Sequence, residues 1–172
     1  MINGSGAHTL TFTAAGLTSA TSSSFTVASS APTFQLAVNG TPTASVASGA
    51  QISIPVSLNI ANGSAANGAN VGALQFNVTW DPTKFTFVSG ALGGSCAAST
   101  RNEGTAASGV VSINGFCSTG VTTSQALYTI TLTAIGASGT SPSVGGAVTV
   151  AADDVGNPIA VSSRGVAVSI TP

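Results

Sequence analysis

The chain has 172 residues, of which only 4% are charged, whereas an average soluble domain has about 25%. Three basic and four acidic residues give a net charge of −1, so the sequence offers no basic patch for nucleic acid or an anionic membrane. Ser, Thr, Asn or Gly interrupts every apolar run well before the roughly 18 residues that a membrane-spanning helix needs, which excludes such a helix.

Two short alternating runs at the N-terminus predict a pair of strands. Leu10 and Phe12 alternate with threonines over residues 8–13, and residues 24–27 form the second run. Because two strands cannot form a stable core in water, the pair needs a partner. That partner is the domain that follows, an upstream domain or another copy of the chain.

The segment GAHTLTFTAAGLTSATSSSFTV, residues 6–27, resembles the last two strands of a bacterial immunoglobulin-like repeat. Small residues and Pro32 then mark a linker. The sequence therefore predicts a strand pair at residues 1–30, as a partial repeat or as donated strands. A separate domain follows at residues 31–172.

The stretch from Val71 to Val88 is the most informative part of that domain. Leu74, Phe76, Val78 and Trp80 alternate with polar residues, which is the period of a half-buried strand. The Asp81-Pro82 corner ends this strand, with Asp81 capping the turn, and Phe85 and Phe87 resume the alternation on the next.

Further strands are predicted on both sides of this centre, with turn signals between them. Pro55 lies within an alternating run and predicts an edge strand or a bulge. Residues 90–108 read as a long surface loop or irregular edge, and residues 163–165 as a turn. Other predicted strands cover residues 34–38, 52–58, 111–116, 128–134, 147–150, 159–161 and 166–170. The fold class is all-β: an antiparallel β-sandwich of jelly-roll or immunoglobulin-like type with eight or nine strands.

Three motifs in this order, VGALQFNVTWDP, FTFVSG and DDVGNPIAVSSRGVAVSI, resemble the cohesin family over residues 33–171. Trp80 stands where the family usually has a tyrosine before Asp-Pro. The resemblance implies a β-sandwich that binds a dockerin partner through one flat sheet face. No contact residue of the family matches this sequence position by position, so none is assigned.

The ionisable residues give little support for an enzyme. His8, the only histidine, falls in the N-terminal strand pair on an outward face, away from any activated serine. Asp153 and Asp154 are adjacent, so on a strand they would point to opposite sides and could not form a glycosidase pair. We expect neither catalysis nor a cofactor.

Two further sets of residues could hold the structure together. Asp153, Asp154 and Asn157 could offer oxygens to calcium, but a turn stabilised by their side chains is the favoured interpretation. Cys96 and Cys117 are the only cysteines, and we predict a disulfide between them.

Polar side chains on two strands form the candidate binding faces. Trp80, Tyr128 and the phenylalanines fall in register with core residues, so no aromatic platform for sugars is predicted. The candidate polar residues, which hydrogen-bond a ligand or are simply solvated, are Gln75, Asn77, Thr79, Thr129, Thr131 and Thr133.

The sequence thus predicts a non-catalytic module for protein–protein assembly or adhesion in a prokaryotic surface scaffold. A dockerin-like protein is the implied partner. A second hypothesis is a filament or sheath subunit that joins identical subunits by donating its N-terminal strands. A third is a carbohydrate-binding module for a polysaccharide. The N-terminus has no signal peptide pattern, and the hydroxyl-rich, lysine-poor composition favours an extracellular or cell-surface location as part of a larger exported protein.

Overall fold

The structure is a computed structural model that describes residues 6–27, 31–65, 68–94 and 99–172. The chain divides into two compact units, Met1–Ala31 and Pro32–Pro172. No helix in the described ranges is long and apolar enough to cross a membrane.

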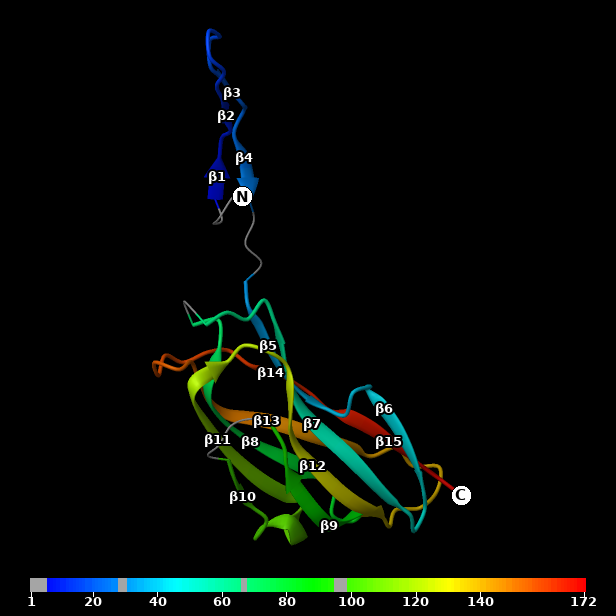
Figure 1. Ribbon diagram of the computed structural model, residues 1–172. Coiled ribbons are helices and arrows are strands. Elements are labelled where there is room, and N and C mark those ends of the chain that lie inside the picture. The colour runs from blue at the N-terminus through cyan, green and yellow to red at the C-terminus, as the bar shows by residue number, and fades with distance from the viewer. Residues whose placement is uncertain (1–5, 28–30, 66–67, 95–98) are drawn as a thin grey trace. The chain divides into compact units, whose positions relative to one another are not determined.

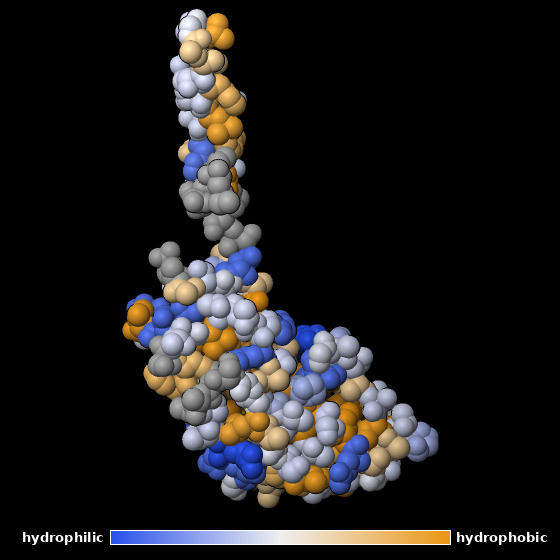
Figure 2. Space-filling model, in the orientation of Figure 1, coloured by the Kyte–Doolittle hydropathy of each residue, from blue (hydrophilic) through white to orange (hydrophobic). Residues whose placement is uncertain are grey.

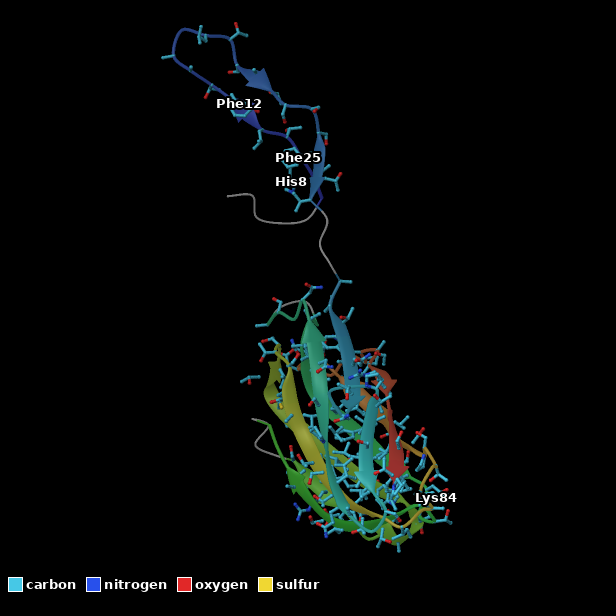
Figure 3. The ribbon with its side chains drawn as sticks, turned by 90° about the vertical axis from the view of Figure 1, so that its right-hand side faces the viewer. His8, Phe12, Phe25 and Lys84 are labelled. Atoms are coloured by element: carbon cyan, nitrogen blue, oxygen red, sulfur yellow. The ribbon has the colours of Figure 1, made fainter. Side chains whose placement is uncertain are left out.

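The first unit is a β-hairpin whose two arms are each interrupted. The strands are β1 (Gly6–His8), β2 (Thr11–Phe12), β3 (Ala20–Thr21) and β4 (Phe25–Val27). β1 pairs with β4 and β2 with β3, so the two predicted strands appear as four short ones. His8 is half-buried against Phe25, with ring centroids 6.2 Å apart, rather than free on an outward face (Figure 3). Phe12 is 64% exposed, so the prediction that the phenylalanines face a core is wrong here.

The second unit is a β-sandwich of two sheets, which confirms the predicted fold class (Figure 1). The five-stranded sheet has the order β14-β5-β7-β12-β9. Its strands, in chain order, are β5 (Thr33–Val38), β7 (Gln51–Ala61), β9 (Phe85–Leu92), β12 (Gln125–Ala134) and β14 (Ser162–Arg164).

The six-stranded sheet has the order β10-β11-β8-β13-β15-β6. Its strands, in chain order, are β6 (Thr43–Ala47), β8 (Val71–Trp80), β10 (Thr100–Asn102), β11 (Val110–Val121), β13 (Ser143–Ala152) and β15 (Val166–Thr171). A single turn of 3₁₀-helix, η1 (Ala106–Ser108), precedes β11. The described residues thus hold eleven strands in the sandwich, two more than the upper sequence estimate, because β6, β10 and β14 were not predicted and the predicted strand at 159–161 is absent.

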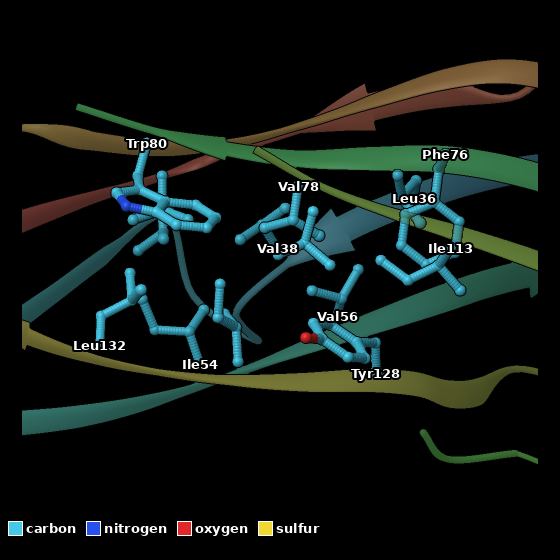
Figure 4. Packing of buried hydrophobic residues seen from close by; sticks show 14 of the residues in the cluster. Leu36, Val38, Ile54, Val56, Phe76, Val78, Trp80, Ile113, Tyr128 and Leu132 are labelled. Atoms are coloured by element: carbon cyan, nitrogen blue, oxygen red, sulfur yellow. The ribbon is translucent and has the colours of Figure 1, made fainter. Parts of the chain in front are cut away.

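The core lies between the two sheets and follows the predicted alternation. Every second residue of β8 from Leu74 to Trp80 is buried, and so is every second residue of β12 from Tyr128 to Ala134 (Figure 4). Trp80 stacks on Phe87 with ring centroids 6.1 Å apart. Each sheet therefore keeps one apolar face inward and leaves the other for contacts.

The chain crosses from one sheet to the other at most of its connections, and two of these crossings produce parallel strand pairs that the antiparallel prediction did not include. β5 and β6 are consecutive but lie in different sheets, and the same holds for β14 and β15. As a result β14 pairs with β5 and β15 with β6, both in parallel. Ser163 and Arg164 therefore belong to a strand, not to the predicted turn, while Ile159 and Val161 pack against the core outside any strand.

Pro55 lies in an interior strand, which corrects the prediction of an edge strand, and a register shift between β7 and β12 lies one residue pair away, opposite Val56. β7 runs between β5 and β12, but β5 ends at Val38, just before it reaches Pro55. The Pro55 carbonyl accepts a hydrogen bond from the Asn39 amide at 2.7 Å, so the proline nitrogen faces the same turn. Asn39 has a left-handed φ of 63°, and Arg164 Nη2 donates to the carbonyls of Asn39 and Gly40, each at 3.1 Å. The missing donor thus falls where the neighbouring strand has already turned away.

Candidate protein-binding surface

Strand β8 lies in the interior of the six-stranded sheet and sets the chemistry of its outer face. Gln75, Asn77 and Thr79 alternate with the buried residues and point outward, each half-buried between neighbouring strands. The register places Asn77 beside Ser112 on β11 and Ala147 on β13. Three of the six predicted polar residues therefore share this surface.

Asn77 is held in place by a hydrogen bond across the strands. Ser112 Oγ donates to Asn77 Oδ1 at 2.8 Å. The bond fixes the amide plane, so the Nδ2 group keeps two donors for a ligand. Among the described residues no partner uses them.

Two apolar side chains stand on the strands that flank β8. Phe116 on β11 is 54% exposed and lies opposite Ala73, and Val150 on β13 is 51% exposed and lies opposite Gln75. Ala73, the residue opposite Phe116, has only a methyl side chain, and both apolar groups remain about half exposed. We call this surface the β8 face, defined by Gln75, Asn77, Thr79, Ser112, Phe116 and Val150.

The exposure of Phe116 was missed because all sandwich phenylalanines were expected in the core. The signal was present: Val111 and Ile113 point inward, so Phe116, three positions further on, falls on the outer face. For Val150 no such signal existed. A register shift between Val148 and Val150 reverses the alternation and turns Val150 outward.

The remaining predicted polar residues, Thr129, Thr131 and Thr133, lie on the opposite surface of the sandwich. They point outward from β12 in the five-stranded sheet. Ser53 and Thr131 share a hydrogen bond between their hydroxyl oxygens at 3.1 Å. A single ligand bound to one sheet cannot contact both sets, so the six predicted residues form two candidate faces.

Aromatic side chains for stacking on sugars are scarce in the described part of the sandwich. Trp80 is 6% exposed and Tyr128 is fully buried, as predicted, and Phe116 is the exposed aromatic residue there. Polysaccharide binding stays a prediction that no feature of the described residues favours.

The acidic turn after β13 is held by hydrogen bonds of its own side chains and by bonds to Asn70. Both carboxylate oxygens of Asp153 accept hydrogen bonds, Oδ1 from the amides of Val155 and Asn157, and Oδ2 from Asn157 Nδ2 at 2.9 Å. The Asn157 side-chain bond and the backbone donors hold the pKa of Asp153 below its usual range. Asp154 exchanges two hydrogen bonds with buried Asn70, each 3.0 Å. These bonds use both carboxylate oxygens of Asp153 and one of Asp154 within the protein. Calcium binding by Asp153, Asp154 and Asn157 stays a prediction.

A polar network ties the β10 segment to the core. Tyr128 Oη donates to Glu103 Oε1 at 3.0 Å, and the same oxygen lies 3.0 Å from Arg101 Nε. Burial, and then the bond to Glu103, raise the pKa of the Tyr128 hydroxyl. Gly90 makes room for this side chain, because a Cβ at position 90 would overlap the Tyr128 hydroxyl. The tyrosine is therefore a structural tie and not an exposed acid.

Asp81 caps its own turn, as predicted. Its Oδ1 accepts from the Thr83 hydroxyl at 2.7 Å and from the Thr83 amide at 2.8 Å, and these bonds lower the pKa of the carboxyl. Cys117 lies on β11, whereas Cys96 lies outside the described residues, so their disulfide stays a prediction.

Comparison with known proteins gives a consistent result. A family model described as "Cohesin domain" matches residues 34–168. No curated protein matches the chain in sequence. Among solved structures, a non-cellulosomal cohesin from Archaeoglobus fulgidus is 15% identical, with a TM-score of 0.62 over 81% of this chain and 92% of that one.

Two complexes contain similar modules. The Coh-OlpA–Doc918 cohesin–dockerin complex from Clostridium thermocellum gives a TM-score of 0.64 at 14% identity, covering 80% of this chain and 99% of that one. The third cohesin ScaC from Acetivibrio cellulolyticus, in complex with the ScaB dockerin, gives 0.64 at 16% identity, covering 81% and 99%. The family match spans most of the chain and the fold agrees with it, so the chain belongs to the cohesin family.

Proposed function

We propose that this chain is a non-catalytic assembly module that binds a dockerin-type protein through its β8 face. Family membership supports a role in protein–protein assembly, and two of the similar solved structures are cohesin–dockerin complexes. The β8 face combines exposed apolar anchors with fixed hydrogen-bonding groups on a rigid sheet. Such a combination is typical of the centre of a protein interface.

The pair of Phe116 and Val150 is the observation that carries the choice of face. Each side chain is about half exposed, and both stand on strands that pair directly with β8. Large aromatic groups that become fully buried on binding supply much of the affinity of an interface. The described outer face of the five-stranded sheet has hydroxyl groups but no exposed aromatic side chain.

The positions of the ionisable groups support a role without catalysis. Asp153, Asp154 and Glu103 are each engaged in hydrogen bonds within the protein. Asp81 caps a corner, and His8 belongs to the other unit. A hydrolytic site would need such groups to converge on a substrate.

Binding to a panel of dockerin domains, including Doc918 and the ScaB dockerin, tests the proposal. We expect surface plasmon resonance to detect saturable binding that Phe116→Asp weakens at least about 100-fold, because it buries an unpaired charge at the interface centre. Ser89→Asp is the matched control, since Ser89 is exposed on the opposite sheet. If Ser89→Asp abolishes binding and Phe116→Asp does not, the binding face is the other one, and the absence of binding to any dockerin contradicts the function.

An extracellular scaffold is the proposed setting. The pair of cysteines suits an oxidising compartment, and the low lysine content suits an exported surface protein. One of the similar solved cohesins is described as part of a scaffoldin, scaffoldin B of Acetivibrio cellulolyticus. Surface labelling of intact cells with an antibody against the sandwich tests this setting, and signal only after lysis contradicts it.

The N-terminal hairpin favours self-assembly as a second candidate function. Leu10, Phe12 and Leu17 are 43%, 64% and 75% exposed, and orange atoms gather along one side of the hairpin in Figure 2. An apolar strand pair of this kind can add to the sheet of another subunit. Deletion of residues 1–30 should then remove polymers seen by negative-stain microscopy, and unchanged polymers would rule the hairpin out.

A further inference from the structure

Most of the charged side chains of this protein interact with other groups of the same chain. Six of the seven make a hydrogen bond or ion pair within the chain: Asp81 with Thr83, Arg101 with Glu103, Asp153 with Asn157, Asp154 with Asn70, and Arg164 with the carbonyls of Asn39 and Gly40. The seventh, Lys84, lies at the corner between β8 and β9, at the lower edge of the sandwich in Figure 3.

None of these seven residues lies on the β8 face. Asp81 and Lys84 follow the end of β8, and Asp153 and Asp154 follow the end of β13. Arg101 is on the edge strand β10, opposite the inward-pointing Ile113, so it falls on the inner side of the register. The β8 face and its neighbours therefore present amides, hydroxyls, alanine, Phe116 and Val150.

A face without charged side chains disfavours charged partners, because it offers no counter-charge to them. A charged side chain of the partner would lose its water on docking and would find no counter-charge, which costs free energy. An apolar side chain would cover Phe116 and Val150, and a hydroxyl or amide group would pair with the free donors of Asn77. The face therefore binds uncharged partner surfaces more tightly than charged ones, although it carries no charge that would repel either.

We infer that the partner docks with an uncharged contact surface, an apolar anchor surrounded by hydroxyl and amide groups, and that the association is therefore insensitive to salt. The inference rests on the proposed function and adds the chemistry of the partner. It separates this module from interfaces whose association is steered by opposite charges.

A displayed dockerin library tests this inference. The cohesin-facing positions of one dockerin scaffold are randomised to all amino acids, and binders are selected on the immobilised full chain at low salt, where charged contacts are strongest. We expect charged residues to be depleted at the central positions of the selected clones. The Kd of these clones should change less than about twofold between about 0.05 M and about 1 M NaCl, because no exposed ion pair is screened.

Asn77→Asp provides the matched variant. An aspartate at this position still accepts the hydrogen bond from Ser112, so the local structure is kept while one negative charge enters the face. We expect the selected dockerins to bind this variant at least about tenfold more weakly. A second selection on the variant should enrich lysine and arginine, with a Kd that rises with salt. Ser89→Asp, on the other sheet, should leave the first set of clones unaffected.

The outcomes separate the two proposals. If the clones selected on the native chain are enriched in charged residues, or if their Kd rises tenfold or more with salt, the inference about partner chemistry is wrong. Sensitivity of the same clones to Phe116→Asp would still leave the proposed function standing. If no clone binds, or if binding ignores Phe116→Asp, the proposed function fails and this inference fails with it.

Discussion

The N-terminal hairpin and the sandwich share one sequence pattern but differ in what the pattern buries. In β12 the apolar residues Ile130 and Leu132 are fully buried, whereas Leu10 and Phe12 of the hairpin are 43% and 64% exposed. Both segments alternate apolar residues with threonine. The inner face of β12 meets a second sheet, and the described hairpin contains no second layer of its own. Alternation thus predicts a strand, and only packing decides whether its apolar face is buried.

Leu132→Ala should have the largest effect on stability. Leu132 is fully buried between the sheets, so the substitution leaves a cavity that the surrounding core cannot fill. We expect a loss of about 2–5 kcal/mol in the free energy of unfolding of the sandwich, measured by guanidinium denaturation.

Phe12→Ala is the counterpart in the hairpin, and it removes a larger side chain. Because Phe12 is mostly exposed, we expect the unfolding free energy of the sandwich to change by less than about 0.5 kcal/mol. A loss comparable to that of Leu132→Ala would break the comparison, since it would mean that the hairpin face is buried in solution.

Gly90→Ala should destabilise the sandwich next most strongly. The added methyl group would overlap the Tyr128 hydroxyl, which is held by Glu103, so β9 or the tyrosine must move. We expect a loss of about 1–3 kcal/mol in the free energy of unfolding. Gly40→Ala is the control, because a Cβ there meets no atom within 4 Å, and its unfolding midpoint should stay near that of the native protein. Equal effects of the two substitutions would argue against the tight contact.

Much of the fold could be predicted because the sandwich repeats a local rule. The alternation of Leu74, Phe76, Val78 and Trp80 fixed both the strand and its buried face, and the Asp81 corner followed from turn chemistry. Pro55 misled the prediction, since a proline excludes a ladder donor but cannot reveal that the neighbouring strand ends beside it.

The candidate site was only half predictable for a related reason. Asn77 and Thr131 were both recognised as outward residues, but the sequence does not say that they belong to different sheets. Val150 depends on a register shift, which leaves no signature in local composition. Strand order and bulges result from contacts between distant segments, and a single sequence does not display such contacts.

Arg164→Met should have a smaller effect, confined to the turn between β5 and β6. The arginine donates to the carbonyls of Asn39 and Gly40, and its loss leaves these groups to water. We expect a loss of about 1–2 kcal/mol in the free energy of unfolding, because methionine keeps most of the apolar stem. Hydrogen exchange should rise at the end of β5 and not in the hairpin. Faster exchange throughout β12 would contradict so local a role.

The smallest expected effect is a loss of thermal stability at acid pH. It should come from the sandwich alone, because all four acidic residues lie there. Hydrogen bonds from Asn157 and from Thr83 hold the pKa values of Asp153 and Asp81 below their usual range. The folded state then binds a proton more weakly than the unfolded chain does. The stabilisation is therefore present above the unfolded pKa of about 3.9, and it is lost as the pH falls through the folded pKa.

We expect the melting temperature to be level from about pH 8 to about pH 5 and to fall below about pH 4. Asp153→Asn should melt lower at neutral pH, because the NH2 group that replaces Asp153 Oδ2 cannot accept the hydrogen bond from Asn157 Nδ2, and it should lose less on acidification. A native protein with the same melting temperature at pH 7 and at pH 3 would show that these turns do not stabilise the fold.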